Sequence, residues 1–153
     1  MGLEVGDLVP VFQAVDDNER LFRSTNVIGI KDVVIYFYPK NFAPDCIEEA
    51  CGFRDHYEAF TSFGAEVIGI SGDSVGSHAR FKKRYKLPFT FLSDDEGELQ
   101  QLFGVRSELF GLLPGRETYV IDKEGIVRLK FNDKKAFSHI TTALNTLKEI
   151  NKE

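Results

Sequence analysis

Two cysteines, Cys46 and Cys51, are the only thiols in a chain of 153 residues. A thiolate is a strong nucleophile, so two thiols this close together suggest redox chemistry; two inert, buried cysteines are the alternative. A zinc site is a weaker interpretation. Structural zinc needs four ligands at recognisable spacing, and the histidines are scattered at His56, His78 and His139.

The residues before Cys46 place this thiol at the start of a helix. Residues 36–55 read YFYPKNFAPDCIEEACGFRD, in which a buried strand ends at Pro39 and a short loop follows. Asp45 and Glu48 have the spacing of a capping box, with Asp45 as the N-cap. We therefore predict that Cys46 lies in the first helical turn, where free amides and the helix dipole lower the pKa of its thiol.

Acidic side chains next to Cys46 oppose its ionisation, because nearby negative charge disfavours a thiolate. A cation is needed to offset them, and Arg116 is the candidate. It begins the predicted strand 116–122, RETYVID. Pairing of that strand with the strand at 33–38 would bring Arg116 to the same end of the sheet as Cys46.

The spacing of the two cysteines has a mechanical consequence. On a regular helix, Cα atoms five residues apart are about 8–9 Å from each other, whereas a disulfide needs less than about 7 Å. Cys46 and Cys51 can therefore bond only if the first turns of the helix unwind. The alternative is that Cys51 packs on the apolar face of the helix beside Ile47.

Apolar periodicity predicts the elements that position these groups. The expected strands are 33–38, 66–71, 89–92, 118–121 and 126–131, the last two forming a hairpin, and the expected helices are 46–62, 77–85, 96–103 and 136–150. We also expect an N-terminal hairpin that joins 11–14 to 20–24. This order predicts one α/β domain over 1–153 with a thioredoxin-like fold: a central mixed sheet with helices on both faces. A flavodoxin-like fold competes but would not normally carry the late hairpin.

Composition narrows the classes of partner. The chain has 42% hydrophobic and 28% charged residues and a net charge of −5, which fits a soluble globular protein and argues against binding to nucleic acid or anionic membrane. No stretch has the length of a transmembrane span, and residues 1–10 lack the pattern of a signal peptide. We expect a cytoplasmic protein, with a mature organellar form as the alternative, and a monomer, with a weak dimer as the alternative.

Two further motifs have ordinary explanations. Residues 69–76, GISGDSVG, look like a phosphate-binding loop but lack the spacing of one. The acidic cluster at 94–96 is more typical of a helix N-terminus than of a metal site.

Three segments together resemble the peroxiredoxin Q group, also called bacterioferritin comigratory proteins. The motif of that group is Pro, three residues, Thr or Ser, two residues and the peroxidatic Cys, and residues 39–46 read PKNFAPDC. Residues 49–55 resemble the segment with the resolving cysteine, and residues 113–125 the strand with the active-site arginine. Residues 67–74, VIGISGDS, are also similar.

The resemblance implies a thiol-dependent peroxidase that needs no metal or other cofactor. Cys46 would attack peroxide and become a sulfenic acid, Cys51 would condense with it to a disulfide, and thioredoxin or a similar dithiol would reduce that disulfide. Arg116 would stabilise the thiolate and the leaving oxygen. Supporting roles fall to Glu49, which would orient Arg116 or Arg54, and to Pro39, which would shield Cys46.

Two positions depart from the pattern of the group. Ala43 stands where the group has Thr or Ser, and Asp45 stands where Gly is common. Losing a hydroxyl that bonds the thiolate should cost about 1.5–3 kcal/mol, or roughly ten- to a hundredfold in rate. We therefore predict a weakened peroxidase, an inactivated variant, or a substitute polar group, for which main-chain amides around Pro44–Cys46 are the candidates. The alternative function is a non-catalytic redox sensor or a chaperone-like module.

Overall fold

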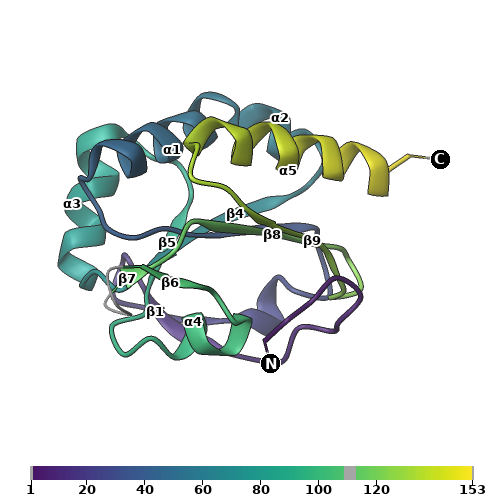
Figure 1. The fold of residues 1–153 in the computed structure, drawn as a ribbon, viewed down its shortest axis with the longest axis horizontal. Coiled ribbons are helices and arrows are strands. Elements are labelled where there is room, and N and C mark those ends of the chain that lie inside the picture. The colour runs from purple at the N-terminus through teal and green to yellow at the C-terminus, as the bar shows by residue number, and fades with distance from the viewer. Residues whose placement is uncertain (1, 109–112, 153) are drawn as a thin grey trace.

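A seven-stranded mixed sheet forms the centre of the computed structural model, with helices on both of its faces (Figure 1). Residues 2–108 and 113–152 are described. The strand order is β2-β1-β5-β4-β3-β8-β9; β3, β4 and β5 are parallel, and the other pairings are antiparallel. The strands are β1 (Gln13–Asp16), β2 (Leu21–Arg23), β3 (Val33–Phe37), β4 (Glu66–Ser71), β5 (Thr90–Ser93), β8 (Glu117–Ile121) and β9 (Val127–Asn132). A separate pair joins β6 (Ser107–Glu108) to β7 (Leu113–Pro114).

In the described part of the chain, helices α1 (Pro44–Asp55), α2 (Tyr57–Ser62), α3 (Val75–Tyr85) and α5 (Ala136–Ile150) lie on one face of the sheet, and α4 (Glu98–Phe103) lies on the other with the N-terminal segment (Figure 1). A short 3-10 helix, η1, covers Ser24–Asn26. None of the helices in the described part of the chain is both long and apolar enough to cross a membrane.

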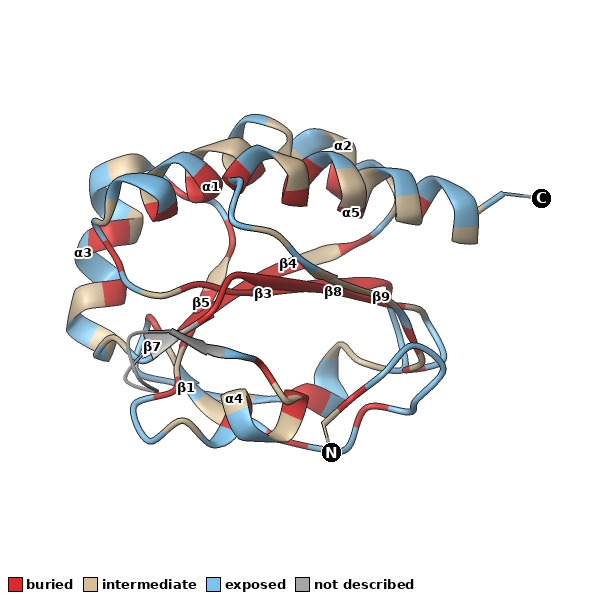
Figure 2. Cartoon of the chain, in the orientation of Figure 1, coloured by how far each residue is buried: buried red, intermediate tan, exposed pale blue. Residues whose placement is uncertain are grey.

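Strand β3 divides its side chains between two cores, because successive residues of a strand point to opposite faces. Val34 and Tyr36 join the core under α1 and α5, whereas Val33, Ile35 and Phe37 join the core beside α4. All five residues of β3 are buried, and the central strands form a continuous buried layer in Figure 2. The apolar run at 33–38 is therefore the centre of both cores.

The contact between α1 and α5 depends on a glycine. A Cβ atom on Gly52 would lie 2.8 Å from Cδ1 of Ile140 on α5, closer than packed atoms allow. The main chain of α1 therefore approaches α5 closely at Gly52, and this contact fixes the second half of α1 against the fold.

The predicted thioredoxin-like fold, N-terminal hairpin and late β8–β9 hairpin are confirmed, with corrections at element boundaries. The single helix expected over 46–62 is wrong: α1 ends at Asp55 and α2 begins at Tyr57. His56 lies between them, and its ring Nδ1 is 3.0 Å from the Gly52 carbonyl oxygen. Helix α3 starts before Ser77, because the Ser74 hydroxyl caps it by accepting from the Ser77 amide.

The acidic cluster at 94–96 lies at the start of α4, as predicted. The carboxylate of Asp94 accepts hydrogen bonds from the amides of Leu99 and Gln100, at 2.8 and 2.9 Å. The helix itself begins at Glu98 instead of Glu96. The cluster thus serves the helix terminus.

Candidate active site

Cys46 lies in the first turn of α1, as predicted, but the helix begins differently. Its N-cap is Ala43 and its first residue is Pro44, so Asp45 lies inside the helix and makes no capping hydrogen bond. Proline suits this first position because it lacks the N–H that would be unpaired there and its φ is already helical. The predicted capping box of Asp45 and Glu48 is therefore wrong.

Antiparallel pairing of β3 with β8 brings Arg116 to Cys46. Glu117 lies opposite Phe37 at the end of β3, and Arg116 directly precedes it. Nη2 of Arg116 donates to Sγ of Cys46 at 3.5 Å, and all of these groups are buried. The thiol and the guanidinium are thus in contact at the predicted end of the sheet.

Glu49 pairs with Arg116 and not with Arg54. Nη1 of Arg116 donates to Oε1 of Glu49, whose side chain is fully buried. Arg54 instead bonds the carboxylate of Asp55 at 2.9 Å and the carbonyl oxygen of Tyr85 at 2.8 Å. The two partners that the sequence left open for Glu49 are therefore reduced to Arg116.

A second layer of buried polar groups lies behind Glu49, from β8 and α5. Oε2 of Glu49 lies 3.8 Å from Nδ1 of His139 and has no hydrogen-bond partner. Nε2 of His139 lies 2.7 Å from the Asp133 carbonyl oxygen, which can only accept, so Nε2 carries the hydrogen. Nδ1 then accepts from the hydroxyl of Thr118, at 2.7 Å.

Sequence reasoning did not assign His139 and Thr118 to the site, although weak signals exist for both. Thr118 is two residues after Arg116, so both share one face of a strand. His139 interrupts the apolar stripe of α5, between Ala136 and Ala143. A buried histidine on such a stripe needs polar partners, and these two provide them.

Burial raises the pKa of the Cys46 thiol, contrary to the prediction from its helix position. The residue is 1% exposed, and desolvation outweighs a hydrogen bond from the Lys40 main-chain amide and the charge of Arg116, which both lower the pKa. Burial likewise raises the pKa of Glu49 to about 8, against the opposing effect of Arg116. The Arg116 guanidinium thus contacts two acidic groups, Cys46 and Glu49, whose pKa values are both raised by burial.

The loop that leads to Cys46 provides main-chain groups and no hydroxyl. The carbonyl oxygen of Ala43 accepts from the amides of Cys46 and Ile47, both at 2.9 Å, while its side chain packs against the core. Pro39 is half-buried at the end of β3. The main-chain amide that lowers the pKa of Cys46 belongs to Lys40, whereas the sequence predicted amides of 44–46.

Cys51 is half-buried on the second half of α1, and both cysteines are free thiols. On the intact helix their Cα atoms are about 8–9 Å apart, beyond disulfide range. Within the described residues, no group of His, Cys, Asp and Glu side chains could hold a metal ion.

The part of the chain that contains Cys46, Glu49 and Arg116 is similar to known proteins. Residues 5–130 match the AhpC/TSA family. Chloroplastic peroxiredoxin Q from Sedum lineare is 48% identical over 146 residues, which cover 95% of this chain and 78% of the relative. The chain is a peroxiredoxin of the AhpC/TSA family. Chloroplastic peroxiredoxin Q from Suaeda salsa is 46% identical over the same length, with 95% and 68% covered.

Solved structures show how far this peroxiredoxin shares a fold. Peroxidoxin BcpB from Mycobacterium tuberculosis superposes with a TM-score of 0.90 at 33% identity, covering 97% of this chain and 99% of that one. The bacterioferritin comigratory protein of Xanthomonas campestris, a structure concerned with alkyl peroxide reduction, gives 0.83 at 26% identity, with 91% of each chain covered. The resemblance to the peroxiredoxin Q group is confirmed, and these relatives support thiol-dependent peroxidase activity.

Proposed function

We propose that this peroxiredoxin reduces hydrogen peroxide and small organic hydroperoxides, with Cys46 as the attacking thiolate. The observation that carries the proposal is the contact between the Arg116 guanidinium and the Cys46 sulfur. A fixed cation there favours the thiolate over the thiol and lies where charge develops on the leaving oxygen. The alkyl peroxide reduction named for the Xanthomonas campestris relative supports the same substrate class.

The first step forms an S–O bond and breaks the O–O bond. The Cys46 thiolate attacks one peroxide oxygen and becomes a sulfenic acid, while the other oxygen leaves as an alkoxide or hydroxide and takes a proton to become an alcohol or water. Arg116 faces the sulfur throughout. The second nitrogen of its guanidinium stays on Glu49, which holds the plane of the group in place.

The second step joins Cys46 to Cys51. The Cys51 thiol attacks the sulfenic sulfur, an S–S bond forms, and water leaves. Because the sulfurs are out of reach on the intact helix, the first turns of α1 must unwind. A dithiol protein of the thioredoxin type then exchanges with the disulfide, donates two electrons and becomes oxidised itself.

Peroxide consumption with mapping of both cysteines tests the cycle. The parent should consume peroxide with thioredoxin as reductant and yield a Cys46–Cys51 disulfide after one equivalent of peroxide. Cys51→Ser should stop at a sulfenic acid on Cys46, and Cys46→Ser should consume none. Peroxide turnover that survives in Cys46→Ser would refute the proposal.

A redox sensor or chaperone-like module is the second candidate. The observation in its favour is that Cys46 has no hydroxyl partner from Ala43 and is nearly inaccessible. Suppression of protein aggregation that survives in Cys46→Ser, in a parent that consumes no peroxide, would favour this candidate.

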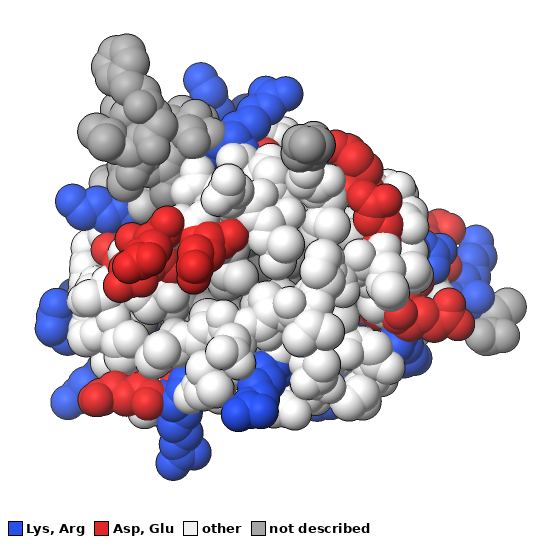
Figure 3. Space-filling model, turned by 90° about the horizontal axis from the view of Figure 1, so that it is seen from below, with Lys and Arg blue, Asp and Glu red and all other residues white. Residues whose placement is uncertain are grey.

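Location and assembly belong to the proposal as well. The cytoplasmic location remains a prediction; the plant relatives named chloroplastic support the organellar alternative, which localisation of the tagged protein would test. Large apolar side chains are exposed in the N-terminal thirty residues, at Val5, Leu8, Val11, Val15, Leu21 and Ile30. The face below the sheet has broad uncharged areas between its charged groups (Figure 3). These features support the weak dimer over the monomer, and light scattering across concentrations would decide.

A further inference from the structure

Asn41 is a polar loop residue that the fold buries. It lies between β3 and α1, flanked by the exposed Lys40 and Phe42, yet it is only 3% exposed itself. Loop side chains usually face water, and a buried amide is costly unless it is hydrogen-bonded. The position therefore has a specific function in the fold or in the site.

Four hydrogen bonds hold Asn41. Its Oδ1 accepts from the Tyr38 hydroxyl at 2.6 Å, and its Nδ2 donates to Ser77 Oγ at 3.1 Å and to His78 Nδ1 at 3.0 Å. Its main-chain amide donates to Oδ2 of Asp73 at 2.8 Å. These partners come from the end of β3, the loop after β4, and α3, so they fix the residue from three directions.

Asp73 gives the segment 69–76 a role that its sequence did not reveal. The Oδ2 atom that holds Asn41 also accepts from Ser71 Oγ at 2.6 Å, and the Asp73 carbonyl oxygen accepts from Ser93 Oγ at 2.6 Å. The carboxylate of Asp73 is therefore fixed to the end of β4, and its main-chain carbonyl to the end of β5. The main-chain amide that this carboxylate binds is that of Asn41, so the segment holds a loop of this chain.

The next residue stores strain in the same loop. Phe42 has a φ of +69°, a conformation that a bulky side chain adopts at a cost of order 1–3 kcal/mol. Its ring packs edge-on against Phe81, with centroids 5.1 Å apart, and contacts Tyr85. The loop is thus held in an unfavourable shape by the anchor at Asn41 and the aromatic contact at Phe42.

We propose that Asn41 is a positioning residue for Cys46: its four hydrogen bonds fix the loop that leads from β3 into the first turn of α1, and so hold the main chain before Cys46 in place where Ala43 lacks a hydroxyl. The inference rests on the proposed function, in which Cys46 is the nucleophile. Release of the anchor would let Phe42 relax and would shift the main chain that leads to the Cys46 thiolate.

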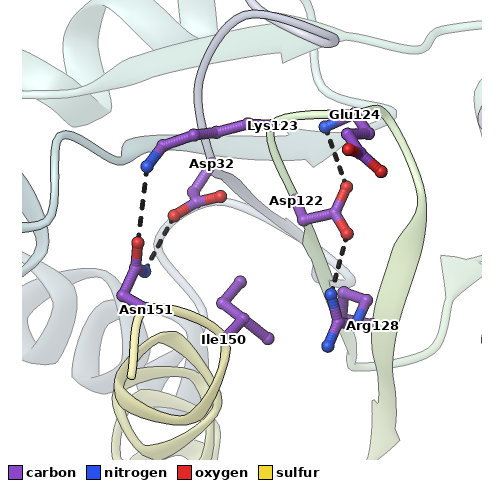
Figure 4. Close-up of a pocket in the computed structure, with 7 residues that line it drawn as sticks. All are labelled: Asp32, Asp122, Lys123, Glu124, Arg128, Ile150 and Asn151. Atoms are coloured by element: carbon purple, nitrogen blue, oxygen red, sulfur yellow. Dashed lines mark hydrogen bonds and ion pairs between the residues drawn. The ribbon is translucent and has the colours of Figure 1, made fainter. Parts of the chain in front are cut away.

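A matched control exists at the other end of the sheet. Asn151, after α5, donates through Nδ2 to Oδ2 of Asp32 at 2.9 Å and to the Leu147 carbonyl oxygen at 2.8 Å. Figure 4 shows it in a pocket lined by Asp32, Asp122, Lys123, Glu124, Arg128, Ile150 and Asn151. Asp32 precedes β3, whereas Cys46 follows it. Asn151→Ala therefore removes a similar amide–carboxylate contact far from the thiol.

The test compares Asn41→Ala and Asn151→Ala in a Cys51→Ser background. The rate of alkylation by iodoacetamide against pH gives the titration of Cys46, and stopped-flow mixing gives the rate with hydrogen peroxide. We expect Asn41→Ala to move the titration to higher pH and to slow the peroxide step by about tenfold or more at neutral pH. Asn151→Ala should change neither quantity by more than about twofold, even at an equal loss of thermal stability.

Asp73→Ala supplies a second variant, should Asn41→Ala fail to fold. It removes the main-chain anchor and should act in the same direction, and combining the two changes should add little. Titration and rates like those of the parent in either folded variant, or equal slowing by Asn151→Ala, would overturn the inference. If the unchanged protein consumes no peroxide, the proposed function is refuted instead. The dependence of alkylation on pH would still decide the role of Asn41.

Discussion

Cys46 and Glu49, one turn apart on α1, hydrogen-bond to the two terminal nitrogens of the same guanidinium. Both are acids in one buried site, and the charge of Glu49 raises the pKa of Cys46. The charge of Arg116 lowers the pKa of each. The site therefore favours one negative charge opposite Arg116 at a time, so ionisation of the thiol is coupled to the proton on Glu49.

This coupling gives opposite effects for Glu49→Gln on two quantities. The pKa of Cys46 should fall, because a neutral amide no longer repels the thiolate. The peroxide rate at high pH, where the thiol is fully ionised, should fall by about tenfold, because Arg116 loses a charged partner that fixes its plane. Alkylation against pH measures the first quantity and stopped-flow mixing the second.

Glu48→Gln is the matched control for this pair. Glu48 is the preceding acid on the same helix, and it is exposed. Solvent screens its charge, so both quantities should stay close to those of the parent. Equal behaviour of the two variants would show that the effect reflects the charge of α1 as a whole.

Ala43→Thr should improve stability and reactivity together. Position 43 is the N-cap of α1, where a threonine side chain typically adds about 0.5–2 kcal/mol to the free energy of unfolding. Its hydroxyl would also be available to the Cys46 thiolate, and we expect a gain of about tenfold or more in the peroxide step. Ala43→Val, similar in shape without the hydroxyl, should show neither gain. A stable threonine variant with no faster peroxide step would mean that the Lys40 amide already compensates.

The raised pKa of Cys46 predicts an alkaline rate profile. Only the thiolate attacks peroxide, so the rate should rise with pH until the thiol is fully ionised. In Cys51→Ser, which isolates this step, the rate should still be climbing at about pH 9, above the ordinary range of a cysteine. A plateau already reached by neutral pH would contradict the effect of burial.

Burial lowers the pKa of both His78 and His139, which makes stability depend on pH. Below about pH 6.5 the unfolded chain binds protons at these positions before the native state does, so acid should destabilise the fold. His139→Gln should flatten the fall in unfolding free energy between about pH 6.5 and 5 in urea titrations. Thr118→Val keeps the imidazole, so it should lower stability while retaining the slope.

Sequence reasoning predicted the parts of the fold that depend on local pattern. The apolar run at 33–38 indicated a strand buried on both faces, and the runs at 118–121 and 126–131 indicated a hairpin. They predicted that Arg116 would reach Cys46 if the two strands were neighbours, and the antiparallel register of β3 and β8 comes from the structure. The start of α1 was predicted less well, because an aspartate with capping-box spacing competed with a proline that already suits the first helical position.

The thiol pKa and the buried polar groups could not be predicted locally. Whether Cys46 is desolvated depends on how α1 and β8 enclose it, and no spacing in the chain encodes that burial. Asn41, Asp73 and His78 meet only because α3 packs beside the loop after β3. Such contacts arise from the tertiary arrangement, so no local sequence motif could predict them.

The close approach of Gly52 to Ile140 gives the proposed disulfide a direction. The second half of α1 packs closely against α5 at Gly52. We therefore expect α1 to unwind from its N-terminal end, at Ala43 and Pro44. Cys46 is then the residue whose sulfur moves, whereas Cys51 keeps nearly the same position. An incoming reductant would meet the bond at the same place in every cycle, which leaves the mobile half of the helix free to refold once the bond is cut.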